Sequence, residues 1–138
     1  MSERNLSYVI DATPAGEPTT LLQVALEYTS LDPHAVHLQF FNDGWPTVSY
    51  RFARCLITEG LARPAGEGDV KVGPHPDQDG QVAIALREAD DDGYPFEIHA
   101  SREDLTDFIE QTYLLVPAGE EVPVDVDAEL AALLRGGA

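Results

Sequence analysis

The sequence predicts an α+β fold in which most of the chain forms antiparallel β-strands. Apolar and polar residues alternate along about seven short segments, which is typical of strands that bury one face. Turns rich in Gly, Pro, Asp and Asn separate these segments, so neighbouring strands can pair antiparallel without long crossovers. Apolar residues recur at helical spacing in the remaining stretches. With 138 residues, the chain is expected to form a single domain, residues 1–138.

Four strands are expected in the first half of the chain. Their alternating residues would share the buried face: Leu6, Tyr8 and Ile10; Leu22, Val24, Leu26 and Tyr28; Val36, Leu38 and Phe40; and Val48, Tyr50 and Phe52. The segment 42–46, NDGWP, separates the third and fourth strands, and its Asp43-Gly44 pair is a hairpin signal. Trp45, the only tryptophan, is expected in this turn.

A short helix is expected after the fourth strand, over about residues 52–59. Phe52, Cys55 and Leu56 lie at helical spacing, and Gly60 follows at a position where glycine often ends a helix. Cys55 is expected on the apolar face of this helix, as a buried structural thiol. Arg54 is expected to lie off that face.

Three strands and two helices are expected in the second half. The strands are predicted within residues 69–74, 81–88 and 94–100, with Val82, Ile84, Leu86, Phe96, Ile98 and Ala100 facing inward. A helix is predicted over 102–115, because Ser101 and Asp104 resemble a capping box and an apolar face follows. Leu130, Leu133 and Leu134 mark a last short helix.

The charge balance limits the possible partners. The chain carries 25 acidic and 8 basic residues, a formal net charge of −17, which repels nucleic acid and anionic lipid. Cys55 is the only cysteine, so an intrachain disulfide and a thiolate zinc site are both excluded. No secretory leader and no segment long enough to span a bilayer is present. A cytoplasmic protein without direct membrane insertion or bound nucleic acid is expected.

No catalytic, cofactor-binding or metal site is expected, and the chain is not predicted to be an enzyme. It lacks a P-loop and a G-x-S-x-G elbow. His34 and His37 are three residues apart, an odd spacing that would turn two strand side chains to opposite faces. The acidic turns 75–80 and 88–93 lack the glutamate that an EF-hand loop needs at its twelfth position. Weak calcium binding at these turns stays open.

Protein binding fits three features better. Four of the eight basic residues fall within residues 50–72: Arg51, Arg54, Arg63 and Lys71. They either balance nearby acids or form a docking site for an acidic surface, including that of a second copy. Trp45 either packs on the core or anchors a contact. Gly119 lies either in a simple turn or in an exposed contact loop. The candidate interface residues are therefore Arg51, Arg54, Arg63, Trp45 and Gly119.

The segments LDPHAVHLQF, TVSYRFARCLITEGLARPAGEGDVKVGP and VAIAL resemble the SsgA-like sporulation and cell division proteins of actinobacteria. The family pattern is D-P-x-A-V-H, then F-A-R-x-L-x-x-E-G-L, then R-P-x-G-x-G-D-V-x-V. The matching residues are Asp32, Pro33, Ala35, Val36 and His37; Phe52, Ala53, Arg54, Leu56, Glu59, Gly60 and Leu61; and Arg63, Pro64, Gly66, Gly68, Asp69, Val70 and Val72. The Pro-x-Gly loop at Pro117–Gly119 also matches.

This resemblance implies a non-enzymatic cell-division adaptor that helps to position or promote sporulation septa. Its partners would be the tubulin-like division protein FtsZ and other SsgA-like proteins, and it would act at the division septum. The implied fold is a barrel-like α+β unit, similar to the Whirly-type single-strand DNA binders, and it assembles as a homotrimer. The alternative is a Whirly-type single-stranded nucleic-acid-binding module. The net charge opposes it, because such modules need basic grooves.

Overall fold

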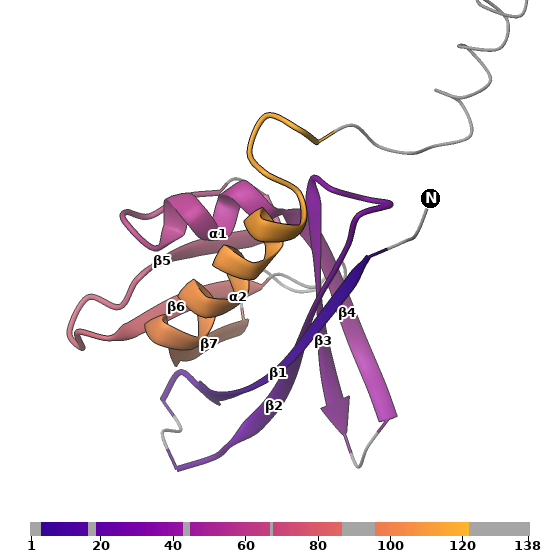
Figure 1. Cartoon of the computed structure of the whole chain (residues 1–138). Helices are drawn as coiled ribbons and strands as arrows, with labels where there is room; N and C mark the ends of the chain where they lie inside the picture. Colours follow the sequence, from indigo (N-terminus) through magenta and orange to yellow (C-terminus); the bar gives the residue numbers. More distant parts are fainter. Residues whose placement is uncertain (1–3, 17–18, 43–44, 67, 87–95, 122–138) are drawn as a thin grey trace, which may run out of the picture.

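The computed structural model describes residues 4–16, 19–42, 45–66, 68–86 and 96–121. Its elements, in chain order, are β1 (Asn5–Pro14), β2 (Leu22–Thr29), β3 (Ala35–Asn42), β4 (Trp45–Ala53), α1 (Arg54–Gly60), β5 (Val70–Pro74), β6 (Gln81–Leu86), β7 (Phe96–Ser101) and α2 (Arg102–Leu115). The expected order of four strands, a short helix, three strands and a long helix is confirmed (Figure 1).

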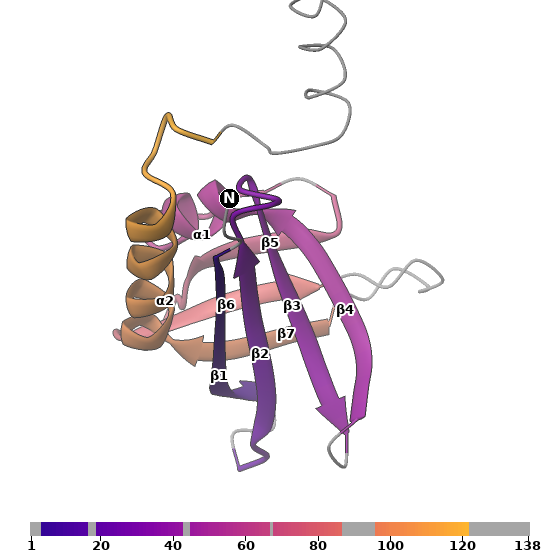
Figure 2. The ribbon, with the colours of Figure 1, turned by 45° about the vertical axis from the view of Figure 1, so that its right-hand side comes forward.

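All seven strands belong to one antiparallel sheet in the order β4-β3-β2-β1-β7-β6-β5. The long strand β1 is shared by two halves, because Asn5–Ala12 pair with β2 and Ala12–Pro14 pair with β7. The strands β5, β6 and β7 run across the direction of β2, β3 and β4 (Figure 2). The sheet thus curls into a nearly closed barrel, and α1 connects its two edge strands, β4 and β5.

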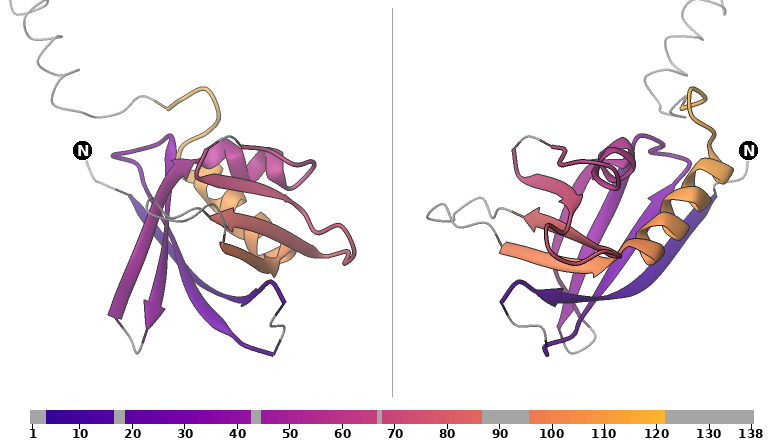
Figure 3. Two further views of the ribbon diagram at one scale, coloured as in Figure 1. Left: turned by 180° about the vertical axis from the view of Figure 1, so that it is seen from behind. Right: turned by 90° about the vertical axis from the view of Figure 1, so that its left-hand side faces the viewer.

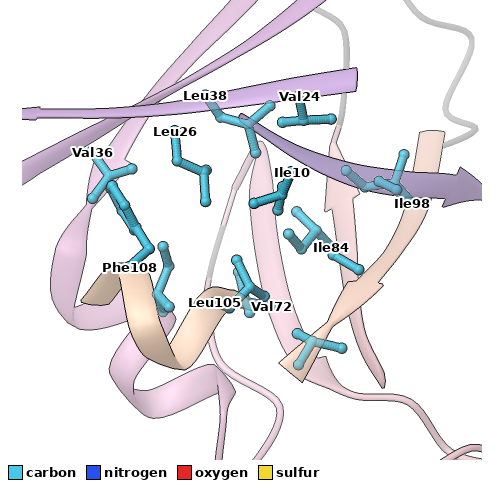
Figure 4. Close-up of a cluster of buried hydrophobic side chains, with 14 of the residues drawn as sticks. Ile10, Val24, Leu26, Val36, Leu38, Val72, Ile84, Ile98, Leu105 and Phe108 are labelled. Carbon is cyan, nitrogen blue, oxygen red and sulfur yellow. The ribbon is translucent and has the colours of Figure 1, made fainter. Parts of the chain in front are cut away.

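The hydrophobic core fills the space between the two halves of the sheet and the helix α2. Alternating residues of the strands point into it, together with Leu105 and Phe108 of α2 (Figure 4). The ring of Phe108 meets that of Tyr8 edge-on, with ring centroids 5.5 Å apart. Because α2 lies against β1 and β7 (Figure 3), it covers an opening that the curled sheet alone would leave.

The buried faces predicted for the strands are confirmed over most of their length. Two residues differ: Val48 is 39% exposed and Phe96 is 42% exposed. Phe96 is the first residue of β7, and Val48 lies in the half of β4 that is nearer the β3–β4 turn. Strand ends have fewer neighbours above them than strand centres, so apolar side chains there stay partly open to water.

The short helix starts later than its apolar spacing suggests. Phe52 remains in β4, where it pairs with Val36, and α1 begins at Arg54. The buried side of α1 therefore carries Arg54, Ile57 and Gly60. Cys55 is exposed, so the prediction of a buried thiol is wrong. Successive helical residues are about 100° apart, so a small shift of the start turns a different face inward.

The second half of the chain follows the sequence closely. The helix α2 spans the predicted residues, and the Ser101 hydroxyl accepts a hydrogen bond from the Asp104 backbone N–H at 3.3 Å. The acidic residues Glu103 and Asp104 occupy its first turn, where the helix dipole favours negative charge. The helix expected near Leu130–Leu134 and the acidic turn at 88–93 lie outside the described residues.

Candidate protein-interaction surface

Arg54, the first residue of α1, has its side chain inside the protein, where it is only 2% exposed. Its Nη1 donates a hydrogen bond to the backbone carbonyl of Thr112 at 2.9 Å, and its Nη2 donates to Oε1 of Glu121 at 2.8 Å. The guanidinium carbon lies 3.9 Å from the ring centre of Tyr113 and 5.3 Å from that of Tyr28. One side chain thus connects α1, the end of α2, β2 and the loop after α2.

The expectation that Arg54 lies on the surface as a docking residue is wrong. A guanidinium stays charged inside a protein, so burial requires an anion and aromatic faces around it. Glu121 provides the anion, and its own side chain is 19% exposed. The ring of Tyr113 adds a cation–π contact, on the order of 2 kcal/mol when desolvated. Among the described residues, no group accepts a hydrogen bond from Nε of Arg54, and this unpaired donor offsets about 1–3 kcal/mol of that gain.

The aromatic residues around Arg54 are themselves held in place. The hydroxyl of Tyr28 donates to the backbone carbonyl of Pro33 at 2.9 Å, and its burial raises the pKa of Tyr28 above the ordinary value. The hydroxyl of Tyr113 lies 3.1 Å from that of Thr58 on α1. The Arg54 contacts therefore belong to a fixed structural cluster within one chain.

Gly119 lies in the turn that brings Glu121 to Arg54. It has a φ of +87°, which favours glycine, and its backbone N–H donates to Oε2 of Glu121 at 3.0 Å. The hydrogen bond from Arg54 lowers the pKa of the Glu121 carboxyl. Gly119 is exposed, and a Cβ there would contact nothing within 4 Å. The turn therefore has a structural role, while its outer side remains free for contacts.

Arg51 lies on the outer face of β4 and is 60% exposed. Its Nε and Nη2 donate to the two carboxylate oxygens of Asp32, both at 2.9 Å. His37, its cross-strand neighbour, places Nε2 3.6 Å from Asp32. The hydrogen bond from Arg51 is the main reason that the pKa of Asp32 is lowered. Such an exposed pair contributes at most about 1 kcal/mol to the free energy of unfolding. Arg51 therefore neutralises a nearby acid but adds little stability.

Arg63 lies on the exposed connection between α1 and β5, close to a groove on the outer face of the sheet. This β5–β7 groove has a volume of about 720 Å³, and its lining includes Pro64, Lys71, Gly73, Ala83, Ala85 and Glu97. Neither Arg63 nor Lys71 forms an ion pair with the described residues, although both are exposed. Lys71 belongs to the basic segment seen in the sequence, but the sequence did not predict the groove that it lines.

No local sequence pattern predicts the groove, because it depends on close contacts between separate segments. Gly60 packs so near β5 that a Cβ would lie 2.4 Å from Val72 Cγ1. Gly66 has a φ of +108°, and a Cβ there would lie 2.5 Å from the Val70 carbonyl oxygen. These glycines let the loop after α1 fold back onto β5 and form one side of the groove.

The remaining sequence-based expectations concern Trp45, a metal site and a membrane-spanning helix. Trp45 begins β4, where it pairs with Asn42, rather than lying in the turn. Its side chain lies outside the described residues, so its role stays a prediction. Within the described parts of the chain, no group of three or more His, Cys, Asp and Glu residues could hold a metal ion. No helix in these parts is long and apolar enough to cross a membrane.

Comparison with known proteins identifies relatives along nearly the whole chain. Residues 22–121 match the family described as Streptomyces sporulation and cell division protein, SsgA. The chain is 36% identical over 125 residues to sporulation-specific cell division protein SsgB of Frankia casuarinae, covering 90% of this chain and 85% of the relative. It is 39% identical over 115 residues to SsgB of Thermobifida fusca, covering 80% and 79%.

A solved structure supports the same conclusion. The crystal structure of an SsgA-like sporulation-specific cell division protein from Thermobifida fusca YX-ER1 matches with a TM-score of 0.79 and 34% identity. The match covers 95% of this chain and 96% of that one. The family resemblance and the barrel-like α+β fold predicted from the sequence are both confirmed.

Arg54 and Arg51 offer a matched test of the structural assignment. We expect Arg54→Ala to lower the free energy of unfolding by about 3 kcal/mol or more, because it leaves a cavity and removes one partner of a buried pair. We expect Arg51→Ala, which removes an exposed pair, to lower it by less than about 1 kcal/mol. Urea denaturation followed by circular dichroism measures both. Equal losses for the two variants would contradict the assignment.

The Glu121 carboxylate predicts a specific acid sensitivity. Its folded-state pKa is depressed, so its stabilising effect is full above its ordinary value of 4.5 and is lost as the pH falls through the lower folded value. We therefore expect the parent to lose more stability than Glu121→Gln between about pH 6 and about pH 3. Urea midpoints measured across this range provide the comparison. Parallel pH profiles for the two proteins would show that the pair does not titrate as described.

Proposed function

The chain belongs to the SsgA family of sporulation and cell division proteins, and on that premise we propose that it is a non-enzymatic division adaptor. In this proposal it helps to position or promote sporulation septa by recruiting FtsZ through protein contacts. The observation that carries the proposal is the match to relatives named sporulation-specific cell division proteins along 80% to 90% of the chain.

The structure explains every resolved pKa shift among the described residues. The groups with shifted pKa values are Tyr28, Asp32, Arg51 and Glu121. Each has a structural explanation in burial or in an ion pair, and none of these shifts needs a reacting substrate to explain it. The family is likewise named for sporulation and cell division rather than for a reaction.

We propose that the protein forms a homotrimer in the cytoplasm at the division septum, where it contacts FtsZ and other SsgA-like proteins. Arg51, Arg63, Trp45 and Gly119 remain candidates for these interfaces. Arg54 is no longer among them, because its guanidinium is already engaged within one chain.

Co-sedimentation with FtsZ polymers tests the adaptor role. We expect the protein to pellet with FtsZ assembled in GTP and to stay in the supernatant with unassembled FtsZ. Light scattering on the same sample should give three times the 15.0 kDa mass of one chain. A protein that remains in the supernatant under both conditions would contradict FtsZ recruitment. A mass equal to one chain would contradict the proposed trimer but not FtsZ recruitment.

The nucleic-acid alternative makes a different prediction. A Whirly-type module would bind single-stranded DNA with an affinity that falls steeply as salt rises. We expect no such binding, because the chain carries a net charge of −17. Fluorescence anisotropy of a labelled oligonucleotide, titrated at low and at physiological salt, measures it. Salt-sensitive binding would favour the alternative over the adaptor.

A further inference from the structure

We propose that the β5–β7 groove is a docking site for an extended acidic peptide segment of a partner protein. This inference rests on the proposed adaptor function, and it specifies a surface and a ligand chemistry for it. Four observations support it: a floor of small residues, walls held by hydrogen bonds and packing, cations without carboxylate partners among the described residues, and an edge strand that is already paired.

The floor of the groove consists of Ala83 and Ala85, and Gly73 lies beside it, covered by Pro64. Gly73 pairs with Ala83 across β5 and β6, so the two lie side by side on the outer face. Their inward neighbours, such as Ile84, are buried in the core. Small outward side chains allow another backbone to approach the sheet closely, which a face of large side chains would prevent.

The walls of the groove are held in place before any ligand binds. On one side, Pro64 packs so close to Gly73 that a Cβ added to Gly73 would lie only 3.1 Å from the Cα of Pro64. On the other side, Pro76 lies in a turn that His75 holds in place. The Asp77 backbone N–H donates a hydrogen bond to Nδ1 of His75 at 3.0 Å. A preformed groove binds a peptide at a lower entropic cost than one that must first become ordered.

The charges differ between the two sides of the groove. Lys71 lies on the β5 side, and the exposed Arg63 directly precedes the wall residue Pro64. On the β7 side, the carboxylate of Glu97 already interacts with Nε2 of His99, at 2.9 Å. The β5 side is thus the one that attracts carboxylates, and we place the acidic side chains of the peptide there.

The negative charge of the whole chain does not prevent this binding. At physiological salt, charges more than about 8 Å apart are largely screened from each other. Distant acids of the protein therefore repel a bound peptide only weakly, while Lys71 and Arg63 act at short range on one side of the groove and Glu97 on the other. The net charge would instead slow the approach of the peptide at low salt.

The peptide is expected to lie on the face of the sheet and not to extend it. The outer edge of β5 is already paired with the loop, since Ala65 N–H donates to the Val72 carbonyl at 2.8 Å and Val72 N–H donates back at 3.0 Å. An extended chain turns alternate side chains to opposite sides. Small apolar side chains on one side could thus rest above Ala83 and Ala85, while acidic ones on the other side would be reached by the long, flexible side chain of Lys71, which extends past the floor.

The test is a fluorescence titration of the full chain with a labelled peptide of alternating aspartate and valine, at physiological salt. We expect Lys71→Glu and Arg63→Glu each to weaken binding about fivefold or more, because each replaces an attraction by a repulsion. Ala85→Phe should weaken it by filling the floor. Arg4→Glu, an equal charge change at the start of β1, is the control and should bind like the parent.

The outcomes separate this inference from the proposed function. Thermal melting first shows that each variant is folded. If the groove variants bind the peptide as the parent does, or if a matched lysine–valine peptide binds equally well, the groove assignment is wrong. If the parent pellets with FtsZ and the groove variants pellet equally, the adaptor function stands and the groove is not its docking site. Groove-dependent peptide binding without any FtsZ pelleting supports the groove and contradicts FtsZ recruitment.

Discussion

The buried guanidinium of Arg54 is the interaction on which the arrangement of the helices depends. A permanent charge inside a protein of this size requires a fixed set of partners, and here they come from three parts of the chain: β2, the end of α2 and the loop after α2. Since α1 begins at Arg54, the position of its first turn relative to α2 is set by these contacts. The helix α2 covers the core, so these contacts also connect α1 to the element that closes the barrel.

Alternation and capping were sufficient to predict most of the fold. The strand faces around Leu26, Leu38 and Ile84, and the helix α2, followed from spacing alone, because each depends on a local repeat. Arg54 and Cys55 were misplaced for a related reason. The start of a short helix is poorly marked in sequence, and arginine is usually a surface residue. No local pattern connects Arg54 to Glu121, which lies 67 residues away.

Most residues of the family motifs between residues 32 and 72 have structural roles in the fold. Arg54 joins the helices, while Gly60 and Gly66 allow the chain to approach β5 closely. The pairing of Arg51 with Asp32 links the residue just before the second motif to the first motif, on the outer face of the sheet. Motifs of this kind report which architecture is present. The surfaces that choose partners, such as the β5–β7 groove, depend on residues whose proximity arises only after folding.

The pairing of strand β1 has a consequence for how the two halves of the sheet are held together. It pairs with β2 through eight residues but with β7 through three, one of which is Pro14, which has no backbone N–H to donate. The β1–β7 ladder is thus the narrowest seam of the described sheet, and it lies where the strand directions cross. The two halves of the sheet are thus held together mainly by the side chains of the shared core and by α2, and only to a small extent by backbone hydrogen bonds between them.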